Sequence, residues 1–207
     1  MPGVPKVDHK KLDCYRARSG EFRLVDVPPL QYLMIDGYGD PNTSASFREA
    51  VETLFPLAYK LKFASKLELG RDYVVMPLEG LWWADDMDSF TSARDKSKWY
   101  FTVMIMQPEW ITGDMVEAAK EKVAAKGAPP RLDDVRLETL EEGRCVQTLH
   151  LGPFDEEAET LATMHHDVIP AQGLALTGKH HEIYLSDLRR TAPNKLRTIL
   201  RQPVRQA

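Results

Sequence analysis

Glu182 is a charged residue in an otherwise apolar and aromatic stretch of the sequence, His181-Glu-Ile-Tyr-Leu. A strand over 180–185 would place Glu182 and Tyr184 on one face and Ile183 on the other. If Ile183 faces the helices, Glu182 and Tyr184 face a cleft. The low dielectric of a partly desolvated cleft would strengthen the attraction of the carboxylate for a cation or a proton, which could serve a ligand or a reaction. The alternative is a strand glutamate exposed to water on an open sheet face.

Large aromatic residues occur at the predicted strand ends and turns. The candidates for a ligand-binding wall are Tyr38, Trp83, Trp99 and Phe154. Several rings near one carboxylate would bind flat or cationic organic molecules through stacking and cation–π contacts, although each ring could instead belong to the core. The choice between Trp82 and Trp83, and between Trp99 and Tyr100, stays open because a one-residue register shift would exchange the two members.

The histidines do not have the spacing of a metal site. Neither His165-His166 nor His180-His181 can chelate one ion alone, because neighbouring side chains point to opposite faces of a strand and diverge by roughly 100° on a helix. We expect His165 to face the core and His166 to face solvent. The sequence also contains no G-x-S-x-G, Walker or dinucleotide-glycine motif, so it predicts no metal and no cofactor.

The elements that must position these residues occur twice in the same order, which suggests an internal duplication. The predicted elements of the first copy are strands over 22–27 and 30–37, a helix from Thr43 or Ser46, and strands over 73–76 and 78–83. Those of the second copy are a strand over 145–151, a helix over 155–169 and a strand over 180–185. The glutamate near the last strand is Glu79 in the first copy and Glu182 in the second.

Proline and glycine residues divide the predicted elements. Pro56 is expected to kink or restart the first helix, and Gly70 to end it. The segments between the copies are a polar loop over 85–98, a strand over 99–106, a helix over 112–126 and a strand over 135–140. The pattern predicts a mixed α/β fold of the α+β type, with antiparallel hairpins and helices on one face.

The two ends of the chain differ in composition from the rest. Residues 1–20 are polar and predict a loose leader, and the basic stretch over 189–205 predicts a solvated last helix. A single domain therefore spans 21–204, with approximate halves at 21–98 and 99–204.

Overall composition restricts the partners. The net charge of -4 provides no basic surface for phosphate backbones, so nucleic acid is not an expected partner. No apolar run reaches the roughly 18 to 20 residues of a membrane span, and the N-terminus lacks the apolar stretch of a secretory signal. Cys14 and Cys145 are far apart in sequence and are expected to be reduced thiols. We expect a cytoplasmic protein, a monomer or weak homodimer, that binds a small molecule.

Two segments of the sequence resemble a known family. The run from Gln147 to Thr160 and the segment His-His-Glu-Ile-Tyr-Leu-Ser-Asp at 180–187 are similar to the C-terminal half of stand-alone GyrI-like proteins. Pro77-Leu-Glu-Gly-Leu-Trp-Trp and the stretch from Trp99 through Met106-Gln-Pro-Glu are similar to the first half. The resemblance covers roughly 20–204. It implies two pseudo-symmetric strand-helix-strand-strand modules, arranged as an antiparallel sheet or barrel around a central cleft.

The resemblance also implies a function. The effector domains of multidrug-responsive regulators in this family hold cationic drugs with an acidic residue of this strand, and Glu182 occupies that position. The chain lacks the helix-turn-helix region of those regulators. It is similar in length and motifs to stand-alone proteins that hydrolyse the cyclopropane ring of DNA-alkylating cyclopropylpyrroloindoles inside an aromatic cage.

Three hypotheses follow. The first is a detoxifying hydrolase in which Trp83, Trp99, Tyr38 and Phe154 stack on the substrate, Tyr184 donates a hydrogen bond to its carbonyl, and Glu182 activates water. The second is a binding protein that sequesters planar or cationic molecules without turnover. The third, a topoisomerase inhibitor that mimics DNA, fits loosely, since 31 acidic residues are nearly balanced by 27 basic ones.

Overall fold

The computed structural model describes residues 5–85, 95–187 and 190–207. Most of the predicted 85–98 loop lies outside this range. The strands are β1 (Lys6–Val7), β2 (Arg23–Val27), β3 (Leu30–Tyr38), β4 (Asp72–Tyr73), β5 (Glu79–Trp83), β6 (Tyr100–Gln107), β7 (Arg136–Leu140), β8 (Gly143–Leu151), β9 (Leu174–Leu176), β10 (His180–Tyr184) and β11 (Arg197–Gln206). The helices are α1 (Ala45–Glu68), α3 (Gly113–Ala124), α4 (Glu157–Ala162) and α5 (Ile169–Ala171).

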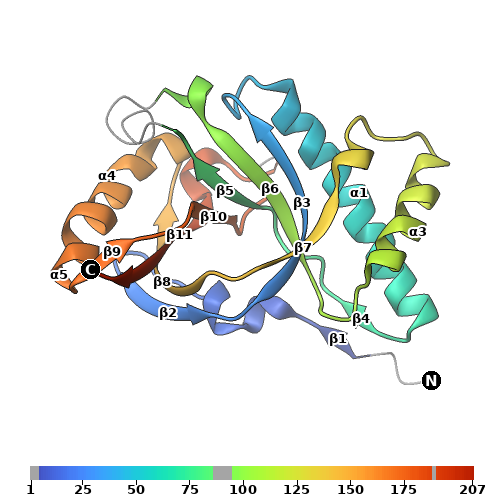
Figure 1. Ribbon diagram of the computed structural model, residues 1–207, viewed down its shortest axis with the longest axis horizontal. Coiled ribbons are helices and arrows are strands. Elements are labelled where there is room, and N and C mark those ends of the chain that lie inside the picture. The colour runs from blue at the N-terminus through green and yellow to red at the C-terminus, as the bar shows by residue number, and fades with distance from the viewer. Residues whose placement is uncertain (1–4, 86–94, 188–189) are drawn as a thin grey trace.

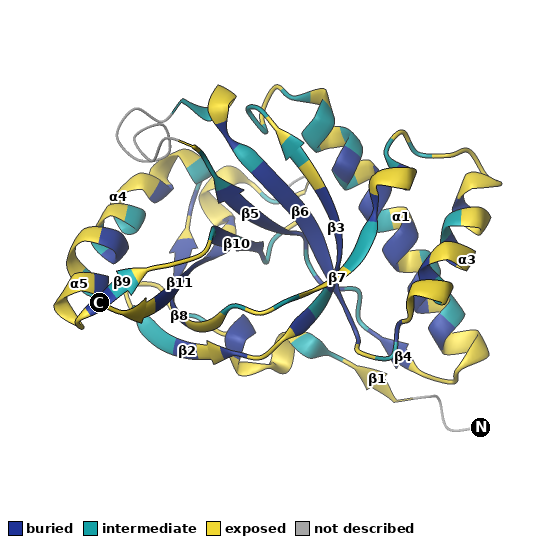
Figure 2. Ribbon diagram, viewed as in Figure 1, coloured by how far each residue is buried: buried dark blue, intermediate teal, exposed yellow. Residues whose placement is uncertain are grey.

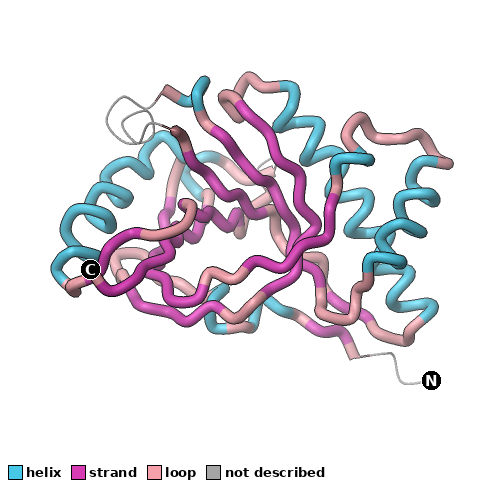
Figure 3. The backbone as a smooth tube through the Cα atoms, viewed as in Figure 1, coloured by secondary structure: helices cyan, strands magenta, loops and turns pink. Residues whose placement is uncertain are grey.

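A large antiparallel sheet forms the centre of the molecule, in the strand order β2-β8-β11-β10-β5-β6-β3-β7, with β9 paired to β11 (Figure 1). The helices form two groups, α1 with α3 and α4 with α5 (Figure 3). The predicted mixed fold is confirmed. Its barrel form is not observed, because β2 and β7 remain at opposite edges of the sheet in the described part of the chain.

Two strand-helix-strand-strand units can be traced in the sheet, β3-α1-β5-β6 and β8-α4-β10-β11, and they meet where β5 pairs with β10. The first unit extends through β6, which pairs with both β5 and β3, so it crosses the boundary expected at residues 98 and 99. The edge strands are exchanged between the units. β2 precedes β3 in the chain but pairs with β8, and β7 precedes β8 but pairs with β3.

Helix α1 continues through Pro56 as one element of 24 residues, so the predicted restart does not occur. Leu54 and Leu57, on either side of the proline, are fully buried against the core, and this packing stabilises the helical conformation on both sides of the proline. The helix begins after Ser44, between the two predicted starts at Thr43 and Ser46. Gly70 follows its end with φ of +64°, as a terminating glycine requires.

The second predicted helix is less regular than its sequence suggests. The region 155–169 contains a 3-10 turn, the short α4 and a π-helical segment over Thr163–Val168 that leads into α5. His165 is buried and His166 is exposed, as predicted.

The two ends of the chain are better ordered than predicted. In the described part of the leader, β1 pairs with β4, and Cys14 and Tyr15 are buried. The basic tail is not a solvated helix. It forms β11, which lies between β8 and β10 and is largely buried (Figure 2). Arg201 is completely buried in this strand because acidic and polar side chains surround its guanidinium group.

The described residues contain no helix that combines the length and the apolar character needed to cross a membrane.

Candidate ligand-binding site

The register of the two central strands brings the candidate residues together. In the antiparallel pair β5–β10, Glu182 lies opposite Gly80 and His180 lies opposite Trp82. Residues that face each other across such a pair share a face of the sheet, so Trp82 lies on the same side as Glu182 and Tyr184. Gly80 leaves the space between them, because a Cβ at this position would lie 2.8 Å from Trp82 Nε1 and 3.2 Å from Tyr184 Oη.

A chain of hydrogen bonds connects the polar groups of this face. Trp82 Nε1 donates to Tyr184 Oη at 3.0 Å, and Tyr184 Oη donates to Glu182 Oε2 at 2.7 Å. The second oxygen, Glu182 Oε1, lies 3.3 Å from His180 Nε2. Burial, together with the negative charge of Glu182, raises the pKa of Tyr184 well above its usual value. Tyr184 therefore remains a neutral proton donor at physiological pH.

These groups open into a cavity of about 150 Å³ between the sheet and the N-terminal ends of α1 and α4. Five aromatic side chains contribute to its wall: Phe47, Trp82, Trp99, Phe154 and Tyr184. The Trp82 ring stacks on that of Phe47 at 5.9 Å between centroids and meets Trp99 edge-on at the same distance. The charged residues of the wall are Glu182, Glu157 and Lys96. Such a wall suits a flat organic molecule, with charge recognition at two carboxylates.

The four predicted aromatic residues occupy different places. Trp99 and Phe154 line the cavity, and Phe154 packs edge-on against Tyr184 at 5.6 Å. Tyr38 and Trp83 do not line it. The pairing of Trp83 with Tyr100, and of Tyr38 with Tyr100, places these rings on the other face of the sheet, where each packs against Tyr100. Half of Tyr38 is exposed, and Lys179 Nζ lies 3.3 Å from the centre of the Trp83 ring.

Sequence reasoning missed three wall residues of different kinds. Trp82 takes the place predicted for Trp83, since it is one residue earlier on β5. Phe47 belongs to the apolar stripe of α1, and such a stripe does not distinguish the core from a cavity wall. Glu157 is buried at the beginning of α4, where an acidic residue ordinarily faces water near the positive end of the helix dipole.

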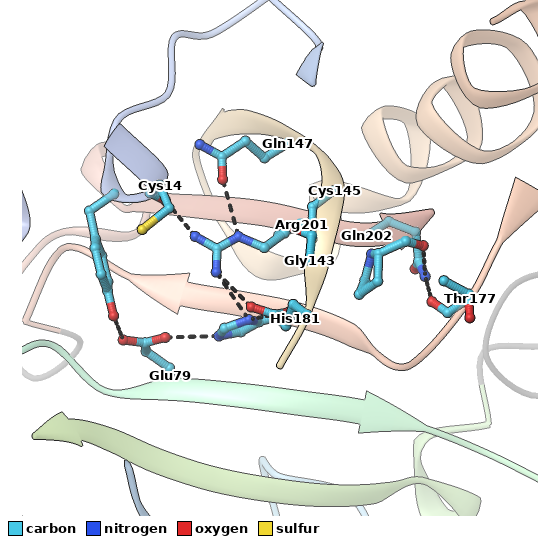
Figure 4. Close-up of polar contacts among 12 residues, drawn as sticks. Cys14, Glu79, Gly143, Cys145, Gln147, Thr177, His181, Arg201 and Gln202 are labelled. Atoms are coloured by element: carbon cyan, nitrogen blue, oxygen red, sulfur yellow. Dashed lines mark hydrogen bonds and ion pairs between the residues drawn. The ribbon is translucent and has the colours of Figure 1, made fainter. Parts of the chain in front are cut away.

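The opposite face of β5 and β10 carries a buried network of charged side chains (Figure 4). His181 Nε2 lies 2.9 Å from Glu79 Oε2, and its Nδ1 lies 2.9 Å from Glu142 Oε1. Arg201 donates to the other oxygen of Glu142 at 2.8 Å, and the Tyr15 hydroxyl donates to Glu79 at 2.6 Å. Glu79 therefore does not share the environment of Glu182, although the duplication suggested that the two correspond. Their side chains lie on opposite faces of the sheet.

The pKa shifts of this network favour a charged His181. Burial lowers the pKa of His181, but the charge of Glu142 and the hydrogen bonds to Glu142 and Glu79 outweigh burial, so the net shift is upward. Burial raises the pKa of Glu142, but the opposite charges and hydrogen bonds of His181 and Arg201 lower it to about 2. Two carboxylates thus face two cations, which allows four charged groups to be buried together.

No group of three or more histidine, cysteine or acidic side chains in residues 5–85, 95–187 and 190–207 is arranged to hold a metal ion.

An open antiparallel sheet made of two strand-helix-strand-strand units, with an aromatic cavity at their junction, defines a small-molecule-binding domain. The chain belongs to the GyrI-like family, because the model of the GyrI-like small molecule binding domain matches residues 20–205. A search of curated proteins finds no match.

Several solved structures are similar over nearly the whole chain. An uncharacterized conserved protein from Listeria innocua has 39% sequence identity and a TM-score of 0.87. Two proteins from the same organism that are described as hydrolases have 38% and 37% identity, with TM-scores of 0.83 and 0.84. Each comparison covers 97% of this chain and 100% of the other. The C-terminal domain of EcmrR shares the fold alone, at 10% identity and a TM-score of 0.57 over 90% of this chain and 98% of that domain.

Proposed function

We propose that this protein binds planar, hydrophobic organic molecules in the aromatic cavity and hydrolyses the strained cyclopropane ring of cyclopropylpyrroloindole-type alkylators. The observation that carries the proposal is the hydrogen-bonded series Trp82–Tyr184–Glu182 in the wall of that cavity. It provides a carboxylate and a neutral phenol beside rings that would hold a flat substrate. The similarity to two proteins described as hydrolases supports a hydrolytic reaction.

The reaction needs one base and one hydrogen-bond donor. Glu182 takes a proton from water as the water oxygen forms a bond to a cyclopropane carbon. The bond between that carbon and the spiro carbon of the dienone breaks, and its electron pair moves through the conjugated dienone to the carbonyl oxygen, which becomes a phenolate. That oxygen then takes up a proton and gives the phenol. The release of ring strain drives the addition, so neither a protein nucleophile nor a metal is required.

Tyr184 has a defined part in this scheme. Its hydroxyl hydrogen points to Glu182, while Trp82 donates to the same oxygen. When the substrate carbonyl binds beside Tyr184, the O–H can turn toward it while Trp82 holds the oxygen in place. Glu182 then has a free lone pair for the attacking water. Stabilising the developing negative charge by a donor already in place lowers the barrier.

The test is to incubate the purified protein with a cyclopropylpyrroloindole and to follow the products by mass spectrometry. We expect many equivalents of a product heavier by one water for each protein molecule. A stoichiometric complex with no water adduct would contradict the enzymatic proposal.

A non-catalytic binding function is the second candidate. The cavity contains two carboxylates, Glu157 and Glu182, among aromatic rings, a combination that suits planar cations through charge attraction and cation–π contacts. Titration with a planar cationic dye distinguishes this function. Saturable binding that Glu182→Gln weakens, together with no turnover of the alkylator, would support sequestration alone.

A further inference from the structure

A second cavity, of about 240 Å³, lies next to the first, with Trp82 in the wall of both. Its wall is more polar. Three almost completely buried polar side chains contribute to it, His165, His180 and Gln202, alongside Trp83 and residues 176–179. Gln202 Nε2 donates to the Thr177 carbonyl at 2.8 Å, which fixes one side of the wall (Figure 4).

His180 connects the two cavities. It lies on the same face of β10 as Glu182, its ring lines the second cavity, and its Nε2 is 3.3 Å from Glu182 Oε1 in the first. The side chains of His180 and Glu182 are only 2% and 12% exposed. An imidazole can take up a proton at one ring nitrogen and release one from the other, so a ring between two cavities can transfer a proton between them.

The neighbouring His165 indicates what the second cavity holds. Its Nε2 is buried and has no hydrogen-bond partner among the described residues, and its ring stands edge-on to that of His180, 6.2 Å away. Burial, followed by the proximity of His180 and His166, lowers the pKa of His165 to about 3, so this ring is neutral. A neutral, buried polar group beside a polar cavity of this size is typically satisfied by ordered water.

We propose that the second cavity is a water site and that His180 is a positioning residue which carries the proton from Glu182 to that water. This inference rests on the proposed hydrolysis. A flat ligand would fill the aromatic cavity and cover Glu182 on that side. The proton that Glu182 takes from the attacking water would then pass from Oε1 to His180 Nε2, and a proton would leave the other ring nitrogen to water in the second cavity. Glu182 returns to its ionised form, and no oxidant or cofactor is needed.

The test compares His180→Ala with His166→Ala, which changes an exposed histidine of the same part of the molecule. We expect His180→Ala to lower kcat for the cyclopropylpyrroloindole by roughly 10-fold to 100-fold, the usual effect of removing a group that supports a catalytic residue, with less than a twofold change in KM. His166→Ala should behave like the wild type. Added imidazole, which fits the space left by the ring, should restore at least part of the lost kcat in a saturable manner.

The opposite results are equally clear. A fall in binding affinity and kcat together, without rescue by imidazole, would mean that His180 has a purely structural role and would overturn the inference.

A second measurement does not depend on turnover. The ring ¹⁵N signals of His180 should move in Glu182→Gln, and a crystal structure at high resolution should contain water in the second cavity. If the wild type shows no turnover, the proposed hydrolysis fails and the proton transfer fails with it, whereas these two results still decide whether the second cavity is a water site beside His180. A dry cavity or unmoved signals would overturn it.

Discussion

The Tyr184 hydroxyl joins the carboxylate of the candidate site to its aromatic wall. It accepts from Trp82 and donates to Glu182, so it takes part both as an acceptor and as a donor. The position of Glu182 is therefore set by a rigid neighbour rather than by solvent. A carboxylate held in this way needs little rearrangement to act as a base.

Replacement of Glu182 by glutamine tests its role as the base. The amide keeps the shape of the side chain but cannot take a proton, so turnover of the cyclopropylpyrroloindole should fall by roughly 10²-fold to 10⁴-fold. The unfolding midpoint should stay close to that of the wild type. Glu159→Gln, at an exposed position on α4, is the matched control. Turnover at the wild-type rate in Glu182→Gln would remove Glu182 from the mechanism.

A pair of tryptophan substitutions tests which rings touch the ligand. Trp99 lines the aromatic cavity, whereas Trp83 packs against Tyr100 on the other face of the sheet. Trp99→Leu should raise the Kd for a planar ligand about tenfold, which corresponds to about 1.4 kcal/mol of lost stacking. Trp83→Leu should change the Kd by less than twofold. Equal effects in equilibrium titrations would contradict the assignment of the wall.

At this scale the sequence predicted relationships within a strand better than relationships between strands. The alternation of side chains correctly placed Glu182 and Tyr184 on one face. It could not distinguish Trp82 from Trp83, because that choice depends on which residue of β5 lies opposite Glu182 on β10. Such pairing is set by the register of the whole sheet, and no local pattern in the sequence records it.

Among the elements, β11 departs furthest from its sequence pattern. Its arginines suggested a solvated helix, yet Arg201 is fully buried and binds Glu142, Gln147 and the backbone carbonyl of Cys14. These partners come from β8, from the turn before it and from the N-terminal segment. A charge can be buried when partners distant in sequence surround it. The sequence pattern around Arg201 shows its charge but does not show those partners.

Removing the Arg201 charge should therefore destabilise the protein strongly. Arg201→Met leaves Glu142 buried with less compensation and should cost about 3 to 5 kcal/mol in the free energy of unfolding. Arg205→Met, at an exposed position on the same strand, should change stability by less than about 0.5 kcal/mol. The double variant Arg201→Met with Glu142→Gln should recover part of the loss in urea denaturation. Additive effects would argue against the ion pair.

The helices show where local rules compete with packing. Gly70 ends α1 as expected, since a positive φ is a local requirement that glycine meets. Pro56 does not interrupt it, because residues on both sides of the proline are anchored in the core. In α1, the glycine correctly predicted where the helix ends, whereas the proline did not predict an interruption, because tertiary contacts stabilise the helix interior.

For the molecule as a whole, three histidines have pKa values that shift on folding and so contribute to the pH dependence of stability near neutrality. Burial lowers the pKa of the half-buried His9, which adds to the acidic side of the profile, and the larger contributions come from His165 and His181. The pKa of His165 is lowered to about 3 on folding, so between pH 3 and about 6.5 the unfolded chain binds more protons and stability rises with pH. The pKa of His181 is raised on folding, so its contribution is complete below about 6.5 and is lost as the pH rises through the folded value. Maximum stability is therefore expected near pH 6.5.

Urea denaturation at intervals from pH 4 to pH 9 measures this profile. His181→Gln should flatten the alkaline side, and His165→Gln should flatten the acidic side. A wild-type stability that keeps rising from pH 7 to pH 9 would contradict a protonated His181 in the folded state. Between about pH 4.5 and pH 2 a further loss is expected, because the Glu142 carboxyl binds a proton in the unfolded chain while its pKa in the folded protein is lowered to about 2.

The reciprocal placement of β2 beside β8 and of β7 beside β3 has a consequence for how the protein opens. If the two strand-helix-strand-strand units separated, the pairing of β2 with β8 or of β7 with β3 would have to break as well. Amide protons of β3 and β8 should therefore exchange with deuterium through one cooperative event at a shared free energy, instead of as two independent subglobal openings. The cavity at the junction would then persist until the entire domain unfolds. A bound molecule would therefore not be released by local separation of β5 from β10.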